Sequence, residues 1–273
     1  MRRIPGLMRC AAVAAMLLAG CLVATGAQAS AATGQVRWAS AKSATVHPGV
    51  SVTMGGVTCR AGFIFTDGTH AFIGVPAGCS GPGPADNSTC TAGQDPTPGT
   101  TVTIGGAKHE GTLVYSSVWT MEVRGQKSVN RCTYNSLSLV RLDGRDIRRT
   151  NPSVPVLGGP TGVSKDQPAA PDQLSVYVSA PSNAEALNTT AGGWSHSMMV
   201  DGVVTGADLG APVLTSSGQA LGLVTGAPTA NGQTLVSDLY REIRYLHSVP
   251  RFADVHLAKG TEKFTPMLAL GSA

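Results

Sequence analysis

Six histidines are the side chains best suited to act as a general base near neutral pH, because imidazole titrates in that range. A hydrolase with a hydroxyl nucleophile also needs a carboxylate that orients the imidazole. Ser195 and His196 are adjacent, but neighbouring residues of a strand point to opposite faces, so they do not form a nucleophile–base pair. We expect His196 to be partly exposed, and His70 and His109 to lie at the surface. The full set is His47, His70, His109, His196, His247 and His256.

Asp143 and Asp146 are the acidic residues to consider for glycoside hydrolysis, which needs two carboxyl groups that face each other across a cleft. They lie close together near the middle of the chain, where we expect a linker to begin. We therefore expect both to be solvated turn residues rather than a catalytic pair.

The cysteines indicate disulfides rather than a metal site. Cys10 and Cys21 lie in the N-terminal segment, which leaves an even set of four: Cys59, Cys79, Cys90 and Cys132. In an exported chain such a set predicts two disulfides. Three pairings are possible, of which Cys59–Cys79 with Cys90–Cys132 is the most local. A zinc site is disfavoured because there is no CxxC pair and no suitably spaced histidine.

The N-terminus has the features of an export signal. Three arginines precede an uncharged, largely apolar run that ends near Gly26 and is short for a membrane span. The small residues Ala27 and Ala29 precede Ser30, as at a signal-peptidase site. Leu18–Cys21 resembles a lipobox, in which Cys21 would be lipidated. The apolar run continues past Cys21, which favours the site before Ser30, with no transmembrane span left in the mature chain.

Composition indicates a chain of many short strands. Its 273 residues include 34 glycines and 17 prolines, and charged residues make up 13%. This chain is too apolar for disorder and too rich in turn formers for a helical bundle. The formal charge of +4 owes three charges to arginines of the expected leader, so no basic face for nucleic acid is indicated.

Turn residues divide the mature chain into short strands, a linker and a final helix. Asp67-Gly68 predicts a hairpin turn, and residues 80–100 predict a loop. A helix is expected over 238–247, with Ser237 as its N-cap. The predicted strands are 50–54, 61–66, 70–75, 102–104, 113–118, 137–142, 174–178, 198–204, 212–215 and 220–225.

Several segments, taken in order, resemble the trypsin-like (chymotrypsin-fold) serine proteases, in particular the secreted actinobacterial branch. Residues 62–65 and 77–79 resemble the segment that leads to the family histidine, and 135–142 resembles the strand after the family aspartate. Residues 207–213 resemble the Gly-Asp-Ser-Gly-Gly-Pro-Val loop, and 220–224 and 236–246 resemble the strand and helix that follow. The resemblance covers residues 47–247 and implies a Cys59–Cys79 disulfide, because the family has a bridge at this place.

The resemblance also implies that all three catalytic positions hold other residues. The family histidine falls on Gly78, the aspartate on Ser136 and the serine on Leu209. Leucine cannot attack a carbonyl, and serine cannot stabilise an imidazolium as a carboxylate does. The oxyanion hole would use the N–H groups of Ala207 and Leu209, but Ala207 replaces a glycine, so we expect a relaxed loop. Asp208 is either the family's structural acid or a turn carboxylate.

The expected fold is all-β, with two six-stranded antiparallel β-barrels and a C-terminal helix. We divide the chain into a signal peptide (1–29), a flexible N-terminal segment (30–46), a first barrel (47–150), a linker (151–172), a second barrel with the helix (173–247) and a tail (248–273).

The function that the resemblance implies is that of an exported pseudoprotease, either secreted or held at the cell envelope. The family binds an extended peptide between its barrels, partly by strand addition, so a peptide or an envelope protein is the expected partner. No cofactor or metal is expected, and the sequence does not define the oligomeric state. The alternative is an active secreted serine-type peptidase, or another hydrolase, that uses residues not recognised above.

Overall fold

The computed structural model describes residues 36–80, 89–93, 95–226 and 228–267, which belong to one unit of the chain. The expected signal peptide and Cys21 lie outside these residues. Within the described ranges, no helix is long and apolar enough to cross a membrane.

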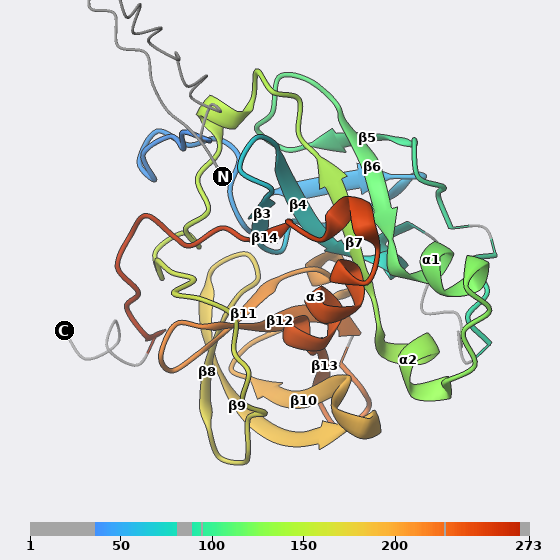
Figure 1. The fold of residues 1–273 in the computed structure, drawn as a ribbon. Helices are drawn as coiled ribbons and strands as arrows, with labels where there is room; N and C mark the ends of the chain where they lie inside the picture. The colour runs from blue at the N-terminus through green and yellow to red at the C-terminus, as the bar shows by residue number, and fades with distance from the viewer. Residues whose placement is uncertain (1–35, 81–88, 94, 227, 268–273) are drawn as a thin grey trace, which may run out of the picture. The chain divides into compact units, whose positions relative to one another are not determined.

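The first half of the chain forms one curled antiparallel sheet, shown in blue to green in Figure 1. Its strands lie in the order β14-β3-β4-β7-β6-β5-β1-β2, so β14 from the tail completes one edge. Asp67-Gly68 lies between β3 and β4, which pair antiparallel as a hairpin, as predicted. The strands of this half are β1 (Ser51–Met54), β2 (Val57–Arg60), β3 (Ile64–Thr66), β4 (Ala71–Pro76), β5 (Thr101–Ile104), β6 (Gly111–Ser116) and β7 (Leu137–Arg141).

The second half forms a closed barrel in the order β10-β13-β12-β11-β8-β9. The predicted all-β fold with two strand assemblies and a terminal helix is confirmed. One detail differs, because the first assembly is a curled sheet joined by a strand from the tail rather than a closed barrel of six. The barrel strands are β8 (Gln173–Tyr177), β9 (Pro181–Thr190), β10 (Ser195–Val200), β11 (Pro212–Thr215), β12 (Ala220–Gly226) and β13 (Gln233–Ser237).

Strands β3 and β4 of the first sheet bury both of their faces. In β3, Ile64 joins the apolar cluster inside the first sheet, whereas Phe65 joins a second cluster with Leu223 and Leu239. Alternate residues of a strand point to opposite faces, so a continuous apolar run marks a strand that is covered on both sides. Gly62 lies directly against Leu223, where a Cβ would clash with the leucine side chain. The two halves therefore approach each other closely at this glycine.

The predicted C-terminal helix is present as α3 (Leu239–His247). Its N-cap is Asp238, whose carboxylate accepts a hydrogen bond from the Arg241 N–H at 2.8 Å. The prediction that Ser237 caps this helix is therefore wrong, because Ser237 is the last residue of β13.

Two further helices, α1 (Ser117–Val123) and α2 (Val129–Tyr134), were not predicted. The strand expected over 113–118 ends at Ser116, whose side chain caps α1. In Figure 1 the two helices lie together at one side of the first sheet.

Two disulfides connect loops to this framework. Cys59–Cys79 joins β2 to the short 3₁₀ turn η1 (Ala77–Ser80), which directly follows β4. Cys90–Cys132 joins the loop after η1 to α2. Of the three possible pairings, the structure has the most local one, as predicted.

The described end of the N-terminal segment is attached to the first half. Both Thr45 and Val46 donate backbone hydrogen bonds to the carbonyl oxygen of Arg149, at 2.9 and 3.0 Å, and Val46 is fully buried. The last residues of the segment that we expected to be flexible therefore pack against the end of the first half.

The tail returns along the first half and the linker. Strand β14 (His256–Leu257) pairs antiparallel with β3, and the Ala258 N–H donates to the Ile64 carbonyl at 2.9 Å. Further along, the Ser153 hydroxyl accepts a hydrogen bond from the Thr261 N–H at 2.8 Å. The tail is thus part of the sheet and of its packing, which its weak sequence pattern did not indicate.

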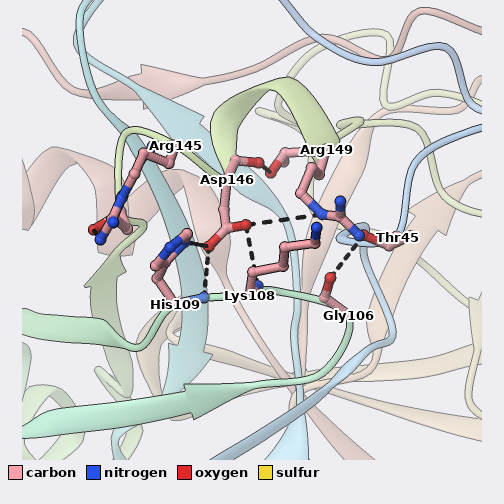
Figure 2. Close-up of polar contacts among 9 residues, drawn as sticks. Thr45, Gly106, Lys108, His109, Arg145, Asp146 and Arg149 are labelled. Atoms are coloured by element: carbon pink, nitrogen blue, oxygen red, sulfur yellow. Dashed lines mark hydrogen bonds and ion pairs between the residues drawn. The ribbon is translucent and has the colours of Figure 1, made fainter.

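A buried carboxylate, that of Asp146, holds the β5–β6 loop against the end of the first half (Figure 2). It accepts hydrogen bonds from the backbone N–H groups of Lys108 and His109, at 3.1 and 2.9 Å, and from the His109 imidazole at 2.9 Å. The Nε of Arg149 lies 3.8 Å from Oδ1 of Asp146. Our expectation that Asp146 is solvated is wrong, because its partners lie on a distant loop; Asp143, in contrast, is only partly buried.

Burial by itself would raise the pKa of Asp146, but the hydrogen bonds from Lys108 and His109 outweigh it and lower the pKa below its ordinary value. The carboxylate is therefore favoured in its charged form. A group with a lowered folded-state pKa stabilises the protein above its unfolded-state pKa, and this stabilisation is lost as the pH falls through the folded-state value.

Asp146→Asn should lower the free energy of unfolding by about 1–3 kcal/mol at neutral pH, because an amide NH₂ would face the N–H donors. The control is Asp143→Asn, which removes a surface pair with Arg145 and should change stability little. Urea denaturation of both variants measures this. The difference between wild type and Asp146→Asn should shrink in acid, and equal stability at neutral pH would contradict the assignment.

Candidate functional site

Gly78 and Ser136, which the sequence pattern matched to the protease histidine and aspartate, lie side by side in the structure. The Ala77 N–H donates to both the carbonyl and the hydroxyl oxygen of Ser136, the latter at 3.2 Å. Gly78 follows Ala77 in η1, so the histidine and aspartate positions of the protease pattern are adjacent here.

The third position, Leu209, is connected to the other two through β2. Cys79 follows Gly78 and is bonded to Cys59, and the next residue, Arg60, donates its N–H to the Leu209 carbonyl at 2.7 Å. The structure therefore brings all three sequence-predicted positions into one neighbourhood.

None of the three residues supplies the group that a protease needs there. Gly78 has no side chain, although a Cβ at this residue would meet nothing within 4 Å. The Ser136 hydroxyl accepts a hydrogen bond from the backbone and carries no charge. Leu209 is an aliphatic residue, so the neighbourhood lacks a nucleophile, a base and an orienting carboxylate at these positions.

The N–H groups of the loop before Leu209 are hydrogen-bonded within the loop itself. It forms a 3₁₀ turn, η4 (Gly206–Asp208). The Ala207 N–H donates to the Thr205 hydroxyl at 3.3 Å, and the Leu209 N–H donates to the Gly206 carbonyl at 3.4 Å. An oxyanion hole requires such donors to point at the substrate oxygen. Here both donors are used within the loop.

The carboxylate of Asp208 stabilises this turn. It accepts hydrogen bonds from the N–H and the hydroxyl of Thr205, both at 2.9 Å, in a reciprocal capping box. Arg60 forms an ion pair with it at 3.6 Å. Asp208 therefore acts as a turn carboxylate here, whereas the other partner considered for it, the mature N-terminus, lies outside the described residues.

The side chain of Leu209 packs between the two halves. It is partly buried, and it contacts both the cluster inside the first sheet and the cluster inside the barrel. The same loop thus provides apolar packing between the halves at the position that the sequence pattern matched to the protease serine.

A carboxyl group that the sequence analysis did not select lies beside Ser136. Glu242 of α3 is fully buried; it accepts the Ser136 N–H and the Ser237 hydroxyl, both at 2.9 Å. Burial raises its pKa to about 8, the two hydrogen bonds oppose this rise, and Asp238 adds to it. Glu242 is therefore mostly protonated at neutral pH. Its place within the apolar stripe of α3 was the sequence feature that could have revealed it.

A hydroxyl, an imidazole and a carboxylate form a second polar chain inside the barrel. The Thr189 hydroxyl lies 3.0 Å from His196 Nδ1, and Asp238 lies 3.2 Å from His196 Nε2. The expectation that His196 is partly exposed is wrong: it is 1% exposed, because β9 and β13 flank its strand. Ser195 donates to the Val236 carbonyl instead, so it does not pair with its neighbour, as expected.

Of the other histidines, His70 is exposed and His109 is partly exposed. Within the ranges described, no three His, Cys, Asp or Glu side chains gather as a metal site would require.

Comparisons with known proteins identify the fold. No protein-family model and no curated protein sequence matches the chain. Among solved structures, protease A of Thermobifida fusca aligns with 80% of this chain and 100% of its own, at 16% identity and a TM-score of 0.51. A chymotrypsin of Cellulomonas bogoriensis aligns with 78% of this chain and 98% of its own, at 15% identity and a TM-score of 0.44. The chain therefore has the two-barrel fold of the chymotrypsin-like serine proteases.

Because Leu209 packs between the two halves, Leu209→Ser should lower the free energy of unfolding by about 1–3 kcal/mol. The loss comes from the apolar burial that is removed and from the hydroxyl that is added. The control is Val203→Ser in the same loop, because Val203 is 83% exposed and should tolerate the change. Thermal and urea denaturation measure both. An unchanged denaturation midpoint for Leu209→Ser would show that packing of this side chain between the halves does not stabilise the fold.

Glu242 should make the protein less stable as the pH rises from about 4.5 to about 8. In this window the folded chain keeps the proton that the unfolded chain has lost, so unfolding releases it and becomes more favourable. The total change should be on the order of 5 kcal/mol. Denaturation across this range should show that Glu242→Gln removes the dependence, whereas Glu110→Gln, at an exposed residue, retains it.

Proposed function

We propose that the chain is an exported, catalytically inactive protein with a serine-protease fold, a pseudoprotease, that acts by binding a peptide or protein or as an envelope scaffold. The observation that carries this proposal is the loop around Leu209. Its two candidate oxyanion donors are hydrogen-bonded within the loop, and its nucleophile position holds a packed aliphatic side chain. Loss of the nucleophile alone would leave donors free, whereas here the donor site is also closed.

A non-catalytic role agrees with how the neighbouring residues are used. Ser136 and Gly78 occur where the chemistry would require an aspartate and a histidine, and Ser136 is hydrogen-bonded to Glu242 of α3. A partner would then be recognised by the backbone of strand edges and by surface side chains, since strand addition needs no catalytic group. Two disulfides support an oxidising, extracytoplasmic environment.

One observation favours the alternative, an active hydrolase. Thr189, His196 and Asp238 form the hydroxyl–imidazole–carboxylate order that nucleophilic catalysis uses. Two features oppose it: the imidazole is buried, and Nδ1 rather than Nε2 faces the hydroxyl, the reverse of the serine-protease arrangement. We therefore keep the pseudoprotease as the proposed function.

The purified protein should not react with a serine-directed fluorophosphonate probe and should not hydrolyse activated esters above the level of the denatured protein. The variant with Gly78→His, Ser136→Asp and Leu209→Ser should remain nearly inactive, because the donors of Ala207 and residue 209 stay within η4. A Cβ at residue 78 would meet nothing within 4 Å, so a steric clash of the new histidine would not explain the lack of activity.

Thr189→Ala is the matched test of the alternative. Ester turnover or probe labelling that this variant abolishes would overturn the pseudoprotease proposal and assign the activity to the polar chain around His196. Strong activity of the triple variant would show that the oxyanion donors can still form their site.

A further inference from the structure

A pocket of about 440 Å³ lies away from Leu209, where α1 and α2 meet α3 and the start of β10. Its wall is unusually basic and aromatic. The side chains that matter here are Arg124, Arg131, Arg241, Arg244, Trp194 and Tyr245.

The arginines of this pocket are held in place by aromatic rings. The guanidinium of Arg131 lies 5.4 Å from the Trp194 ring centroid and 5.5 Å from that of Tyr245. Arg241 also lies over Trp194, at 6.0 Å, and Arg124 over Tyr245, at 5.6 Å. Cation–π contacts of this kind orient a guanidinium without neutralising it. The positive groups are therefore ordered before any ligand arrives.

Among the described residues, these four arginines have no carboxylate partner. Across the described parts of the chain, none of the four arginines lies within 4.0 Å of an acidic oxygen, whereas Arg60, Arg145 and Arg149 all do. The chain has 16 acidic residues for its 20 lysines and arginines, so their absence here is not a matter of composition. In addition, the Arg131 Nε is buried and has no hydrogen-bond partner in the part of the chain that the structure describes.

The backbone beside the pocket leaves room for one of the guanidinium groups. Gly193 has a φ of +84°, and a Cβ at this residue would lie 2.6 Å from an Arg241 nitrogen. The positive φ favours a glycine at this position, and the guanidinium of Arg241 lies directly beside it. The pocket is built from distant segments that only the folded chain brings together.

We propose that this pocket binds a small organic molecule that carries a phosphate group. Guanidinium forks match the oxygen geometry of phosphate, and a phosphomonoester carries a charge of about −1.5 to −2 at neutral pH, enough to offset several arginines at once. The volume is in the range of small-molecule sites, and the edges of Trp194 and Tyr245 provide an apolar wall for the carbon part. The inference is independent of the proposed pseudoprotease function.

Phenyl phosphate is the probe, and benzoate, which has the same ring but a single charge, is its control. Binding is measured on the full protein by calorimetry at low salt, and by the rise in melting temperature that a ligand of the folded state causes. We expect phenyl phosphate to bind and benzoate to bind at least about tenfold more weakly. No binding of phenyl phosphate at millimolar concentration would overturn the proposal.

Arg241→Gln should weaken phenyl phosphate binding by about tenfold or more, and Arg241→Lys should restore it only in part, because lysine keeps the charge but loses the fork. The control, Arg148→Gln, removes an equal charge at an exposed residue outside the pocket and should leave the affinity within about twofold. Equal weakening by Arg241→Gln and Arg148→Gln would indicate non-specific attraction and would contradict the proposal.

Vesicles that contain phosphatidylglycerol distinguish a soluble phosphate ester from a lipid headgroup. Association with vesicles that phenyl phosphate does not displace would contradict a pocket for a small molecule. Displacement by phenyl phosphate would support the pocket as the phosphate site and would indicate a lipid as one source of the group.

Discussion

Three neighbouring strands of the first sheet, β3, β4 and β7, are buried on both faces, and this constraint governs how the rest of the chain is arranged. One face packs inside the curled sheet, and the other must be covered to keep it from water. Leu214 of the barrel, Leu239 of α3 and Leu257 of the tail all join the cluster that covers it. Because three separate segments meet at this surface, the loops at its rim are brought together as well, and these loops carry the protease-like positions.

The same junction shows how the polar groups of this protease-like scaffold are used. A working site keeps donors, a charged group and a hydroxyl poised for substrate, which usually reduces stability. Here the polar groups of the junction bond to one another: the carboxyl group of Glu242 connects Ser136 of the first half to Ser237 of the second. Leu209 extends the apolar contact to the loop itself. The chain thus shares its fold with solved proteases, while apolar packing and hydrogen bonds between the two halves occupy the junction.

The sequence predicted the features that depend on local pattern. Strand β11 has the predicted bounds, the Asp67-Gly68 turn and α3 are present, and the two local disulfides are formed. It failed where the outcome depends on distant partners. Strand β9 was missed because its residues are mostly small or polar, so it shows no apolar alternation.

Burial of polar side chains was the other failure, for the same reason. Asp146 and His196 have the local surroundings of surface residues, and only the partners on other segments, Lys108 and Asp238, show that they are inside.

The pairing of β3 with the tail, finally, bears on the order of folding. Because β14 follows the barrel and α3 in the sequence, the first sheet gains this edge strand only after the second half has been synthesised. The pairing is therefore a long-range contact, of the kind that forms late in folding.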